Sequence, residues 1–304
     1  MVGAFEIPGY VVGEQVGRGG FGEVYRARHE VIGRDVAIKV LHAEVSRDPD
    51  AIERFITEAR AVGNLSHPNI VELYELGALP DGRQYFIMPF IRGKTLAEVL
   101  RERGRLTLAE ALPILRGIAA GVDAAHAAGI AHRDLKPENV FFLDDGSIKL
   151  IDFGLAKLSG DDRAKTETGS SFGTPLYMSP EQCRGKNVTV ATDAYSFGAV
   201  AYQLLTGTPV FSGDALALGL HHLNDTPDRP SKRCAELSAN VDDVLLALLA
   251  KDPADRPIPL TRAVETLGST ARQTSRRRMR GLVVASAVAV LAVAGGFAAH
   301  RLRS

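Results

Sequence analysis

Apolar positions follow two different periods along the chain. From residue 10 to residue 88, short β-branched runs such as Val36–Ile38 alternate with turns, and one helical stretch covers about Ala51–Asn64. From Thr95 onward, apolar residues recur every three or four positions, which is the spacing of one helix face. The pattern therefore predicts an α+β protein, with a small sheet and one helix first and a mostly helical part second.

The last part of the chain contains an uninterrupted apolar run. Residues 281–299 carry no charge, and at about 1.5 Å per residue a helix of that length spans the roughly 30 Å hydrocarbon core of a bilayer. No polar stripe follows one side of it, which disfavours the alternatives of a buried core helix or an amphipathic tail. We expect one transmembrane helix, preceded by a basic linker over residues 269–280 and followed by a short extracytoplasmic tail, residues 300–304.

Charge is balanced in number but unevenly distributed. The chain has 36 basic and 36 acidic side chains, yet every acidic residue lies at or before Glu265 and the seven charged residues after residue 270 are all arginines. Residues 1–270 thus carry a net charge of −7. An acidic body argues against nucleic-acid binding, which needs basic surface. The arginines of residues 276–280 stand before the apolar run, and no signal peptide opens the chain, so we expect the body on the cytoplasmic side of the cell membrane.

Only two cysteines are present, Cys183 and Cys234. They form no C-x-x-C pair and no Cys/His cluster at zinc spacing. The sequence therefore indicates neither a disulfide framework nor a structural metal site, and a reducing compartment is expected.

A glycine-rich string, Gly17-Arg18-Gly19-Gly20-Phe21-Gly22, follows the first predicted strand. Glycines let backbone amides approach phosphate oxygens because no Cβ stands in the way. A dinucleotide-binding turn would lead directly into a helix. Residues 23–27 are instead typical of a strand, which favours a hairpin lid over phosphates.

Further motifs follow in order. The strand residues Val36–Lys39 carry a single lysine, and Glu58 lies 19 residues later in the predicted helix; a buried lysine needs a carboxylate partner. The others are HRDLKPEN at residues 132–139, DFG at 152–154 and SPE at 179–181. In these motifs and their order, residues 10–268 resemble the protein kinases, and most closely the membrane-bound eukaryotic-like Ser/Thr kinases of bacteria.

The resemblance implies a bilobal kinase fold and a nucleotide between the lobes. The N-lobe would cover about residues 10–88, an antiparallel sheet plus one helix, and the C-lobe about 94–268. The implied cofactors are ATP and Mg²⁺, with Mn²⁺ as an alternative metal, and the implied metal ligands are Asn139 and Asp152. The other residues expected around the nucleotide are Val16, Gly17, Arg18, Gly19, Gly20, Phe21, Gly22, Val24, Ala37, Lys39, Glu58, Met88, Pro89, Ile91 and Phe141.

The resemblance also assigns the catalytic roles, because phosphoryl transfer mostly requires positioning and charge neutralisation. Lys39, paired to Glu58, would hold the α- and β-phosphates. Asp134 would orient the attacking hydroxyl group, and Lys136 would neutralise the transferring γ-phosphate. Asn139 completes this catalytic set through the metal.

Two positions around the adenine depart from the family pattern. Pro89 stands where a glutamate is usual, but the adenine contacts that residue's carbonyl and the amide of Ile91, so the missing N–H of proline leaves the contact intact. Phe141 stands where a leucine usually forms the adenine floor. We expect it to change the nucleotide fit and not the chemistry. Met88 resembles the residue that guards the back of the adenine pocket.

The segment that follows Asp134 and the sequence Gly173–Met178 resemble those of Ser/Thr kinases and not those of tyrosine kinases. Thr174 is expected to contact Asp134 and Lys136 and so to favour a short hydroxyl substrate. Its alternative is an ordinary place in a surface loop.

Regulation is expected in the loop between Asp152 and Glu181. Arg133 would be a cation without a partner until an anion arrives, and phosphorylation of the loop would supply one. Thr166 and Thr168 have the T-x-T spacing of bacterial relatives, so we expect autophosphorylation there. The alternative is that these hydroxyl groups only solvate the loop.

Two supporting contacts are expected to be structural. Glu181 would pair with Arg256, and Asp193 would brace the backbone of residues 132–134. Breaking either would cost stability.

Two other functions compete with an active kinase. A pseudokinase scaffold would lack one of the catalytic Lys, Asp or Asn residues, and none is missing. A small-molecule phosphotransferase of similar fold would lack the segment Ser179–Glu181 and its partner Arg256, and both are present. The sequence therefore predicts a non-specific Ser/Thr protein kinase in membrane-anchored signalling, acting on protein substrates and not on nucleic acid, with a homodimer as a further expectation.

Overall fold

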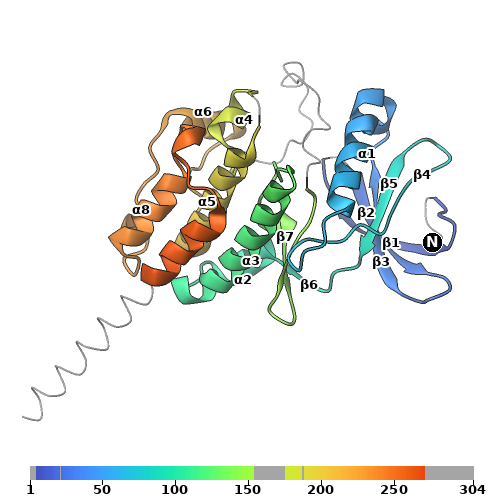
Figure 1. Cartoon of the computed structure of the whole chain (residues 1–304), viewed down its shortest axis with the longest axis horizontal. Helices are drawn as coiled ribbons and strands as arrows, with labels where there is room; N and C mark the ends of the chain where they lie inside the picture. Colours follow the sequence, from blue (N-terminus) through green and yellow to red (C-terminus); the bar gives the residue numbers. More distant parts are fainter. Residues whose placement is uncertain (1–4, 21, 154–174, 187, 271–304) are drawn as a thin grey trace, which may run out of the picture.

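A five-stranded antiparallel sheet forms the lobe at the N-terminal end of the chain (Figure 1). Its spatial order is β1-β2-β3-β5-β4, and all neighbouring strands run antiparallel. The strands are β1 (Tyr10–Arg18), β2 (Gly22–His29), β3 (Asp35–Leu41), β4 (Glu75–Ala78) and β5 (Gln84–Pro89). This confirms the small sheet that the sequence predicts before residue 88.

The central strand β3 buries side chains on both of its faces. Val36 and Ile38 pack into one apolar cluster, while Ala37 and Leu41 pack into another on the opposite face. The alternation follows from the two-residue period of a strand. Lys39 lies between Ala37 and Leu41, so its side chain shares their face, and the residue is only 6% exposed.

One helix, α1 (Pro49–Gly63), covers this second face and lies close to the predicted range of 51–64. Its first turn is capped by Asp48, which accepts a hydrogen bond from the backbone N–H of Asp50 at 3.0 Å. The buried side chains recur at helical spacing, and they are Ala51, Phe55, Ala59 and Val62. Glu58 lies directly before one of them, at the edge of the packed stripe.

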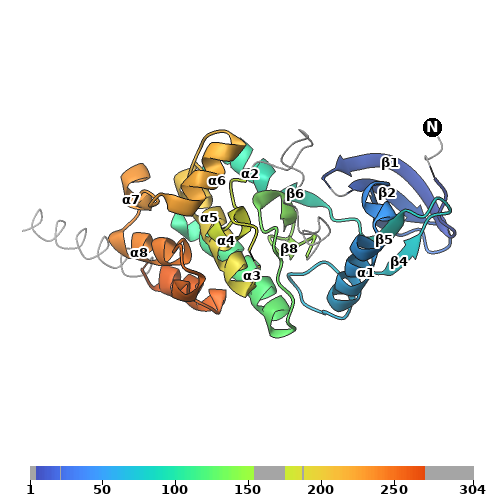
Figure 2. The ribbon, with the colours of Figure 1, turned by 90° about the horizontal axis from the view of Figure 1, so that it is seen from above.

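The second lobe is mostly helical and contains a small three-stranded sheet of order β6-β7-β8. Its elements are β6 (Gly93–Thr95), α2 (Leu96–Arg103), α3 (Leu108–Ala127), β7 (Val140–Leu143), β8 (Ile148–Leu150), α4 (Pro180–Cys183), α5 (Val190–Thr206), α6 (Ala215–Asn224), α7 (Pro230–Arg233) and α8 (Ala239–Leu248). Short 3₁₀ turns occupy Val45–Arg47, Pro137–Asn139 and Pro253–Asp255, and residues 260–270 are helical. The strands β6 and β8 lie between the helices and the N-lobe sheet (Figure 2).

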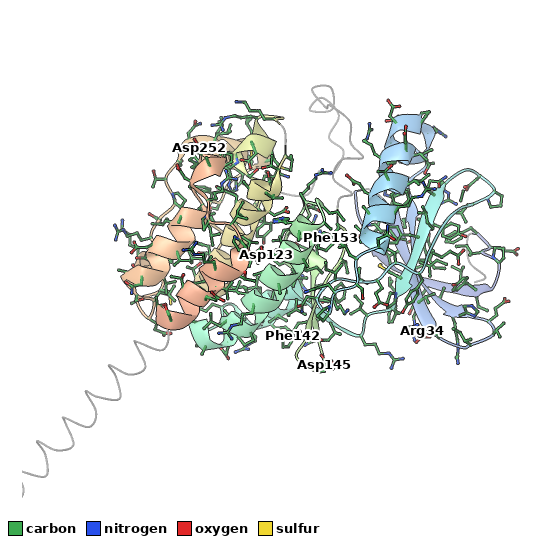
Figure 3. The ribbon with its side chains drawn as sticks, in the orientation of Figure 1. Arg34, Asp123, Phe142, Asp145, Phe153 and Asp252 are labelled. Atoms are coloured by element: carbon green, nitrogen blue, oxygen red, sulfur yellow. The ribbon has the colours of Figure 1, made fainter. Side chains whose placement is uncertain are left out.

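Helix α5 is the centre of the C-lobe core. All but two of its residues are buried, and its apolar side chains divide between the main C-lobe cluster and a second cluster on another side of the helix. The helix contacts both α3 and α8. The last helical segment is held to α3 by Asp123, whose carboxylate accepts the backbone N–H groups of Leu260 and Thr261 at 2.8 and 2.9 Å (Figure 3). The C-lobe therefore presents a rigid floor to whatever lies between the lobes.

The loop between α1 and β4 is joined to the C-lobe by backbone hydrogen bonds. Leu150 donates to the carbonyl of Asn69 at 2.8 Å and accepts from the amide of Val71 at 2.9 Å. Close approach requires a glycine on α3, because a Cβ at Gly121 would stand 2.8 Å from the side chain of Leu150. The position of α1 is thus tied to the strand that ends just before Asp152.

The structure describes residues 5–20, 22–153, 175–186 and 188–270. Within these ranges, no helix combines the length and the apolar character that crossing a membrane requires. Predictions that lie outside the described residues concern Phe21, Gly154, Thr166, Thr168, Thr174, the linker from residue 271 and the apolar run 281–299.

A buried ion pair joins two distant parts of the C-lobe. The guanidinium of Arg256 donates to both carboxylate oxygens of Glu181, at 2.7 and 2.9 Å, and both residues are at least 95% buried. Arg256 also donates to backbone carbonyls of residues 191, 250 and 251. The predicted pairing of Glu181 with Arg256 is confirmed.

Replacing Arg256 with alanine should lower the free energy of unfolding by about 3–5 kcal/mol, because the carboxylate of Glu181 would stay buried without its partner. Urea unfolding of the full chain measures the change. As a matched control, Lys94→Ala removes the exposed pair between Lys94 and Glu102 and should cost at most about 1 kcal/mol. An equal loss in the two variants would contradict the prediction.

Candidate active site

The glycine-rich string forms the turn between β1 and β2. The backbone N–H of Gly19 donates to the carbonyl of Gly22 at 2.9 Å, and β2 begins at Gly22. A side chain at Gly22 would collide with the carbonyl oxygen of Val40 on β3, so only glycine allows this pairing. The predicted hairpin is confirmed, and no helix follows it as a dinucleotide-binding turn would require.

A histidine that the motif analysis passes over holds the tip of this hairpin. Nε2 of His42 lies 2.9 Å from the carbonyl oxygen of Gly19. A carbonyl only accepts, so Nε2 carries the proton of this hydrogen bond. The contact crosses from the end of β3 to the turn and limits the positions that the lid can take.

Several residues expected around the adenine come together on the face of the N-lobe sheet that α1 covers. Ala37 of β3 lies opposite Met88 of β5, and both are buried. Val24 and Ile91 pack on the same apolar cluster. Three other expected residues are not members of this cluster: Val16 lies on β1, Pro89 at the end of β5, and Phe141 on β7.

A charged bracket holds the segment that connects the lobes. Arg26 of β2 lies with its guanidinium 4.9 Å from the ring centre of Phe90, and it donates to the carboxylate of Asp35 at 2.8 Å. Arg92 donates to the same carboxylate at 3.2 Å. The hydrogen bond from Arg26 holds the pKa of Asp35 below its usual range. This bracket was missed in the sequence; in the β2–β3 register Asp35 lies opposite Arg28, two pairs from Arg26.

The catalytic loop is shaped by one buried carboxylate. Asp193, on α5, accepts the backbone N–H groups of His132 and Arg133, each at 2.7 Å, and lies 2.7 Å from Nε2 of His126. Arg133 has a φ angle of 67°, in the left-handed region that side chains with a Cβ disfavour. The two backbone hydrogen bonds hold that conformation. The predicted brace by Asp193 is confirmed, and His126 is an additional member that the sequence analysis missed.

The carboxylate of Asp134 is oriented by the residues that follow it. Nζ of Lys136 donates to Oδ2 at 2.6 Å. The amide nitrogen of Asn139 donates to the same oxygen at 3.2 Å and to the backbone carbonyl of Asp134 at 2.8 Å. The structure thus brings three of the four predicted catalytic residues into direct contact. The expected contact of Thr174 lies outside the described residues.

The fourth, Lys39, does not have the predicted partner. Its ammonium pairs with Oδ2 of Asp152 at 2.6 Å, while the carboxylate of Glu58 pairs with the guanidinium of Arg133. The prediction that Lys39 pairs with Glu58 is therefore wrong in this structure. The prediction that Arg133 lacks a partner until an anion arrives is wrong as well.

The reason for both corrections is the position of α1 relative to β3 and the catalytic loop. Each of these four side chains is at least 80% buried, so each charge needs an opposite partner close by. Two cations and two carboxylates can satisfy this need in two ways. Sequence spacing identifies the four members and does not select between the two pairings.

Asp152 has an atom that is suited to a metal ion. Its Oδ1 is buried and makes no hydrogen bond to any residue that the structure describes, and buried polar atoms rarely stay without a partner. Asp152 also has a left-handed φ of 60°. Asn139 uses its amide nitrogen toward Asp134, which leaves its amide oxygen as the ligand atom. Carboxylate and amide oxygens are ligands that Mg²⁺ accepts, so the two residues fit that ion.

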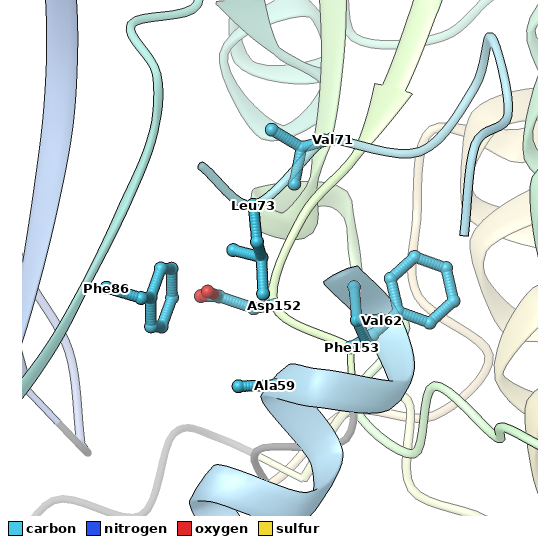
Figure 4. Close-up of a pocket in the computed structure, with 7 residues that line it drawn as sticks. All are labelled: Ala59, Val62, Val71, Leu73, Phe86, Asp152 and Phe153. Atoms are coloured by element: carbon cyan, nitrogen blue, oxygen red, sulfur yellow. The ribbon is translucent and has the colours of Figure 1, made fainter. Parts of the chain in front are cut away.

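Asp152 and Phe153 point in opposite directions (Figure 4). The carboxylate is directed toward Phe86 on β5, and the ring of Phe153 lies beside Val62 of α1 and 4.4 Å from the ring of His132. A cavity of about 20 Å³, roughly the room of one water molecule, lies between these side chains and Ala59.

The comparisons with known proteins agree with this geometry. The protein kinase domain family matches residues 10–266, so the chain belongs to the protein kinase family. Within that family it is similar to bacterial Ser/Thr kinases. It is 38% identical over 283 residues to a probable Ser/Thr-protein kinase PknB of Corynebacterium glutamicum, and 39% identical over 252 residues to Ser/Thr-protein kinase PknB of Mycobacterium tuberculosis. Members of the family use ATP and Mg²⁺, which confirms the predicted cofactors.

These matches cover most of this chain but less than half of each relative. The alignments include 90% and 81% of the chain and 44% and 40% of the two PknB sequences. Among solved structures, the kinase domain of Mycobacterium tuberculosis PknI has a TM-score of 0.73 and 28% identity, covering 89% of this chain and 98% of that one. The bilobal kinase fold is thereby confirmed.

Replacing His42 with alanine should weaken the binding of a non-hydrolysable ATP analogue about threefold to tenfold, because one hydrogen bond that restrains the lid is lost. Calorimetric titration of the full chain measures the affinity. His29→Ala, at the far end of β2, is the matched control and should bind as the wild type does. Unchanged affinity in His42→Ala would show that the contact does not position the lid.

Proposed function

We propose that this chain is an active Ser/Thr protein kinase, which transfers the γ-phosphate of Mg-ATP to serine and threonine hydroxyl groups of protein substrates. The observation that carries the proposal is the oriented carboxylate of Asp134, held by Lys136 and Asn139, together with the carboxylate of Asp152 that pairs with Lys39. A pseudokinase scaffold would need one of these groups to be missing, and all are present.

Each residue has a role that its position supports. The carboxylate of Asp134 would accept the proton of the substrate hydroxyl group, and Lys136 beside it would stabilise charge on the transferred phosphate. When bound, Mg²⁺ neutralises phosphate charge, and Asp152 and Asn139 would hold it. Lys39 would bind phosphate oxygens after leaving Asp152. The glycine-rich hairpin would cover the phosphates with its backbone amides.

Activation would then require an exchange of ion-pair partners. With Lys39 on Asp152 and Glu58 on Arg133, the phosphate-binding lysine is occupied, and its ammonium group stands on Oδ2 of the metal ligand Asp152. A phosphate group on the loop after Asp152 would attract Arg133 more strongly than Glu58 does, because it carries nearly two negative charges. Glu58 would move to Lys39, and Asp152 would be released for Mg²⁺.

Autophosphorylation on Thr166 or Thr168 is the first expected result, because these hydroxyl groups lie in the loop that Arg133 would meet. Mass spectrometry of the full chain after incubation with Mg-ATP should find phosphate on one or both. Asp134→Asn is the control and should carry none. ATP binding without phosphate on wild-type protein would contradict the proposed transfer activity.

The partner exchange predicts that Arg133→Asn restores activity to a chain that cannot be phosphorylated on its loop. Asparagine accepts the left-handed backbone of residue 133, and its loss of charge would release Glu58. In a Thr166→Ala/Thr168→Ala background, we expect phosphorylation of a protein substrate to rise at least about tenfold when Arg133→Asn is added. Lys186→Asn is a surface control, with no rise expected. No recovery would show that Glu58 is not held back by Arg133.

We also propose that residues 281–299 anchor the chain in the cell membrane, with the kinase domain in the cytoplasm. The support is the charge-free length of this run and the arginines before it. Anchoring would raise the local concentration of the kinase and favour pairing of two copies, with phosphorylation in trans.

A double substitution that places two arginines in the middle of the apolar run tests the anchor. The full chain should stay in the membrane pellet after alkaline extraction, whereas Val288→Arg/Leu291→Arg should be released, because each arginine costs about 2.5–3.5 kcal/mol at the centre of a span. Val288→Leu/Leu291→Val is the matched control and should stay. Release of the wild-type chain would exclude the anchor.

A further inference from the structure

His222 is a fully buried histidine on α6 that the catalytic mechanism does not use. Its Nδ1 lies 2.8 Å from the hydroxyl oxygen of Tyr195 on α5. On its other side is the segment of residues 175–178, which leads into α4. A buried polar ring between two helices and a loop needs a partner for each nitrogen.

The chemistry of the tyrosine determines where the proton of His222 lies. Burial raises the pKa of the Tyr195 hydroxyl, so this group keeps its proton and donates it to Nδ1. Burial, and then the nearby charge of Lys251, lowers the pKa of His222 to about 4, so the ring is neutral at physiological pH. A neutral imidazole that accepts at Nδ1 carries its hydrogen on Nε2. His222 is therefore a hydrogen-bond donor at Nε2.

The backbone carbonyl groups of Leu176 and Pro175 are the acceptors near this donor. They raise the pKa of the imidazole, whereas burial lowers it. Nε2 makes no well-formed hydrogen bond to any of the described residues. The carbonyl of Pro175 already accepts from the amide of Met178 at 3.3 Å. This points to the carbonyl of Leu176 as the acceptor for His222.

Contacts to its backbone and to its ring fix the position of His222. Nζ of Lys251 donates to the backbone carbonyl of His222 at 2.7 Å and to that of His221 at 3.3 Å. The ring of Phe211 meets the imidazole edge-on, with the ring centres 5.1 Å apart. A small movement of residues 175–176 would complete the hydrogen bond, whereas a movement of the imidazole would break these contacts.

Residues 175–178 lie beside the catalytic loop. Gln182, which caps α4, donates to the carbonyl of Arg133 at 2.8 Å, and burial together with the charge of Glu138 raises the pKa of Tyr177. Two side chains of α5 hold the second half of the segment: Ser196 donates to the carbonyl of Tyr177 at 2.8 Å, and Gln203 accepts from its hydroxyl group at 2.5 Å. The first half, residues 175 and 176, faces His222.

We infer that His222 is a positioning residue for the polypeptide substrate: its Nε2–H donates to the carbonyl of Leu176 when residues 175–178 close on a bound substrate. The inference rests on the proposed protein kinase activity and deepens it. An unpartnered buried N–H group is costly, so forming this bond only in the closed state favours substrate binding. The nucleotide site does not include this contact, so ATP binding should not depend on it.

Two isosteric variants separate the two nitrogens of the ring. His222→Asn retains a polar group at the position of Nδ1, toward Tyr195, and loses the donor at Nε2. His222→Gln retains an N–H donor close to the position of Nε2. With the full chain and a protein substrate, we expect His222→Asn to raise the KM for that substrate about threefold to tenfold at unchanged KM for ATP, and His222→Gln to stay within about twofold of wild type.

The outcomes distinguish this inference from the proposed function. No transfer by wild-type protein would refute the kinase activity itself. An active wild-type chain with an unchanged substrate KM in His222→Asn would overturn the role of His222. If His222→Asn does not fold, ¹⁵N NMR of histidine-labelled wild-type chain still tests the inference, with His222→Gln identifying the signal: a proton on Nε2 whose resonance shifts when protein substrate is added supports it, and a proton on Nδ1 or no shift overturns it.

Discussion

The buried carboxylate of Asp193 is the contact on which the catalytic geometry depends. It lies on α5, the most deeply buried helix, and it holds the backbone of His132 and Arg133 with two hydrogen bonds of 2.7 Å. Arg133 needs such support because its backbone is left-handed. Asp134 follows directly, so the direction of the catalytic carboxylate depends on a side chain of α5, about 60 residues further along the chain.

Four charged side chains near this loop can form ion pairs in more than one way. Lys39 and Arg133 are the cations, and Glu58 and Asp152 are the carboxylates. In the pairing that the structure shows, each carboxylate has a cation. In the proposed active pairing, Glu58 moves to Lys39, and Arg133 and Asp152 take the loop phosphate and Mg²⁺ as their partners, so the exchange depends on these added charges. The structure joins this choice to the position of α1, since Glu58 is carried by that helix while Asp152 follows a strand that is tied to the α1–β4 loop.

Much of the fold could be predicted from local patterns. The alternation in β3 and the helical spacing in α1 reflect burial of side chains that are neighbours in the chain, and such signals need no knowledge of the rest of the fold. The pairing of Glu181 with Arg256 and the brace by Asp193 were also predicted, from the resemblance to protein kinases. In contrast, the hinge bracket of Arg26 and Asp35 and the contact of His42 with Gly19 were missed, because half-buried polar side chains without a motif give no signal in the sequence.

The sequence by itself determined which residues bear the chemistry: the glycine string, Lys39, Asp134, Asn139 and Asp152 stand at fixed spacings, and their types are dictated by phosphate and metal binding. Only the tertiary structure decided how the charges pair and which way the buried histidine of α6 donates. The reason is physical. A charge in a buried site pairs with whichever opposite group the packing of the helices brings within about 3 Å, and the proton of a neutral imidazole lies where its neighbours allow it. Both depend on distances between segments that are far apart in the chain.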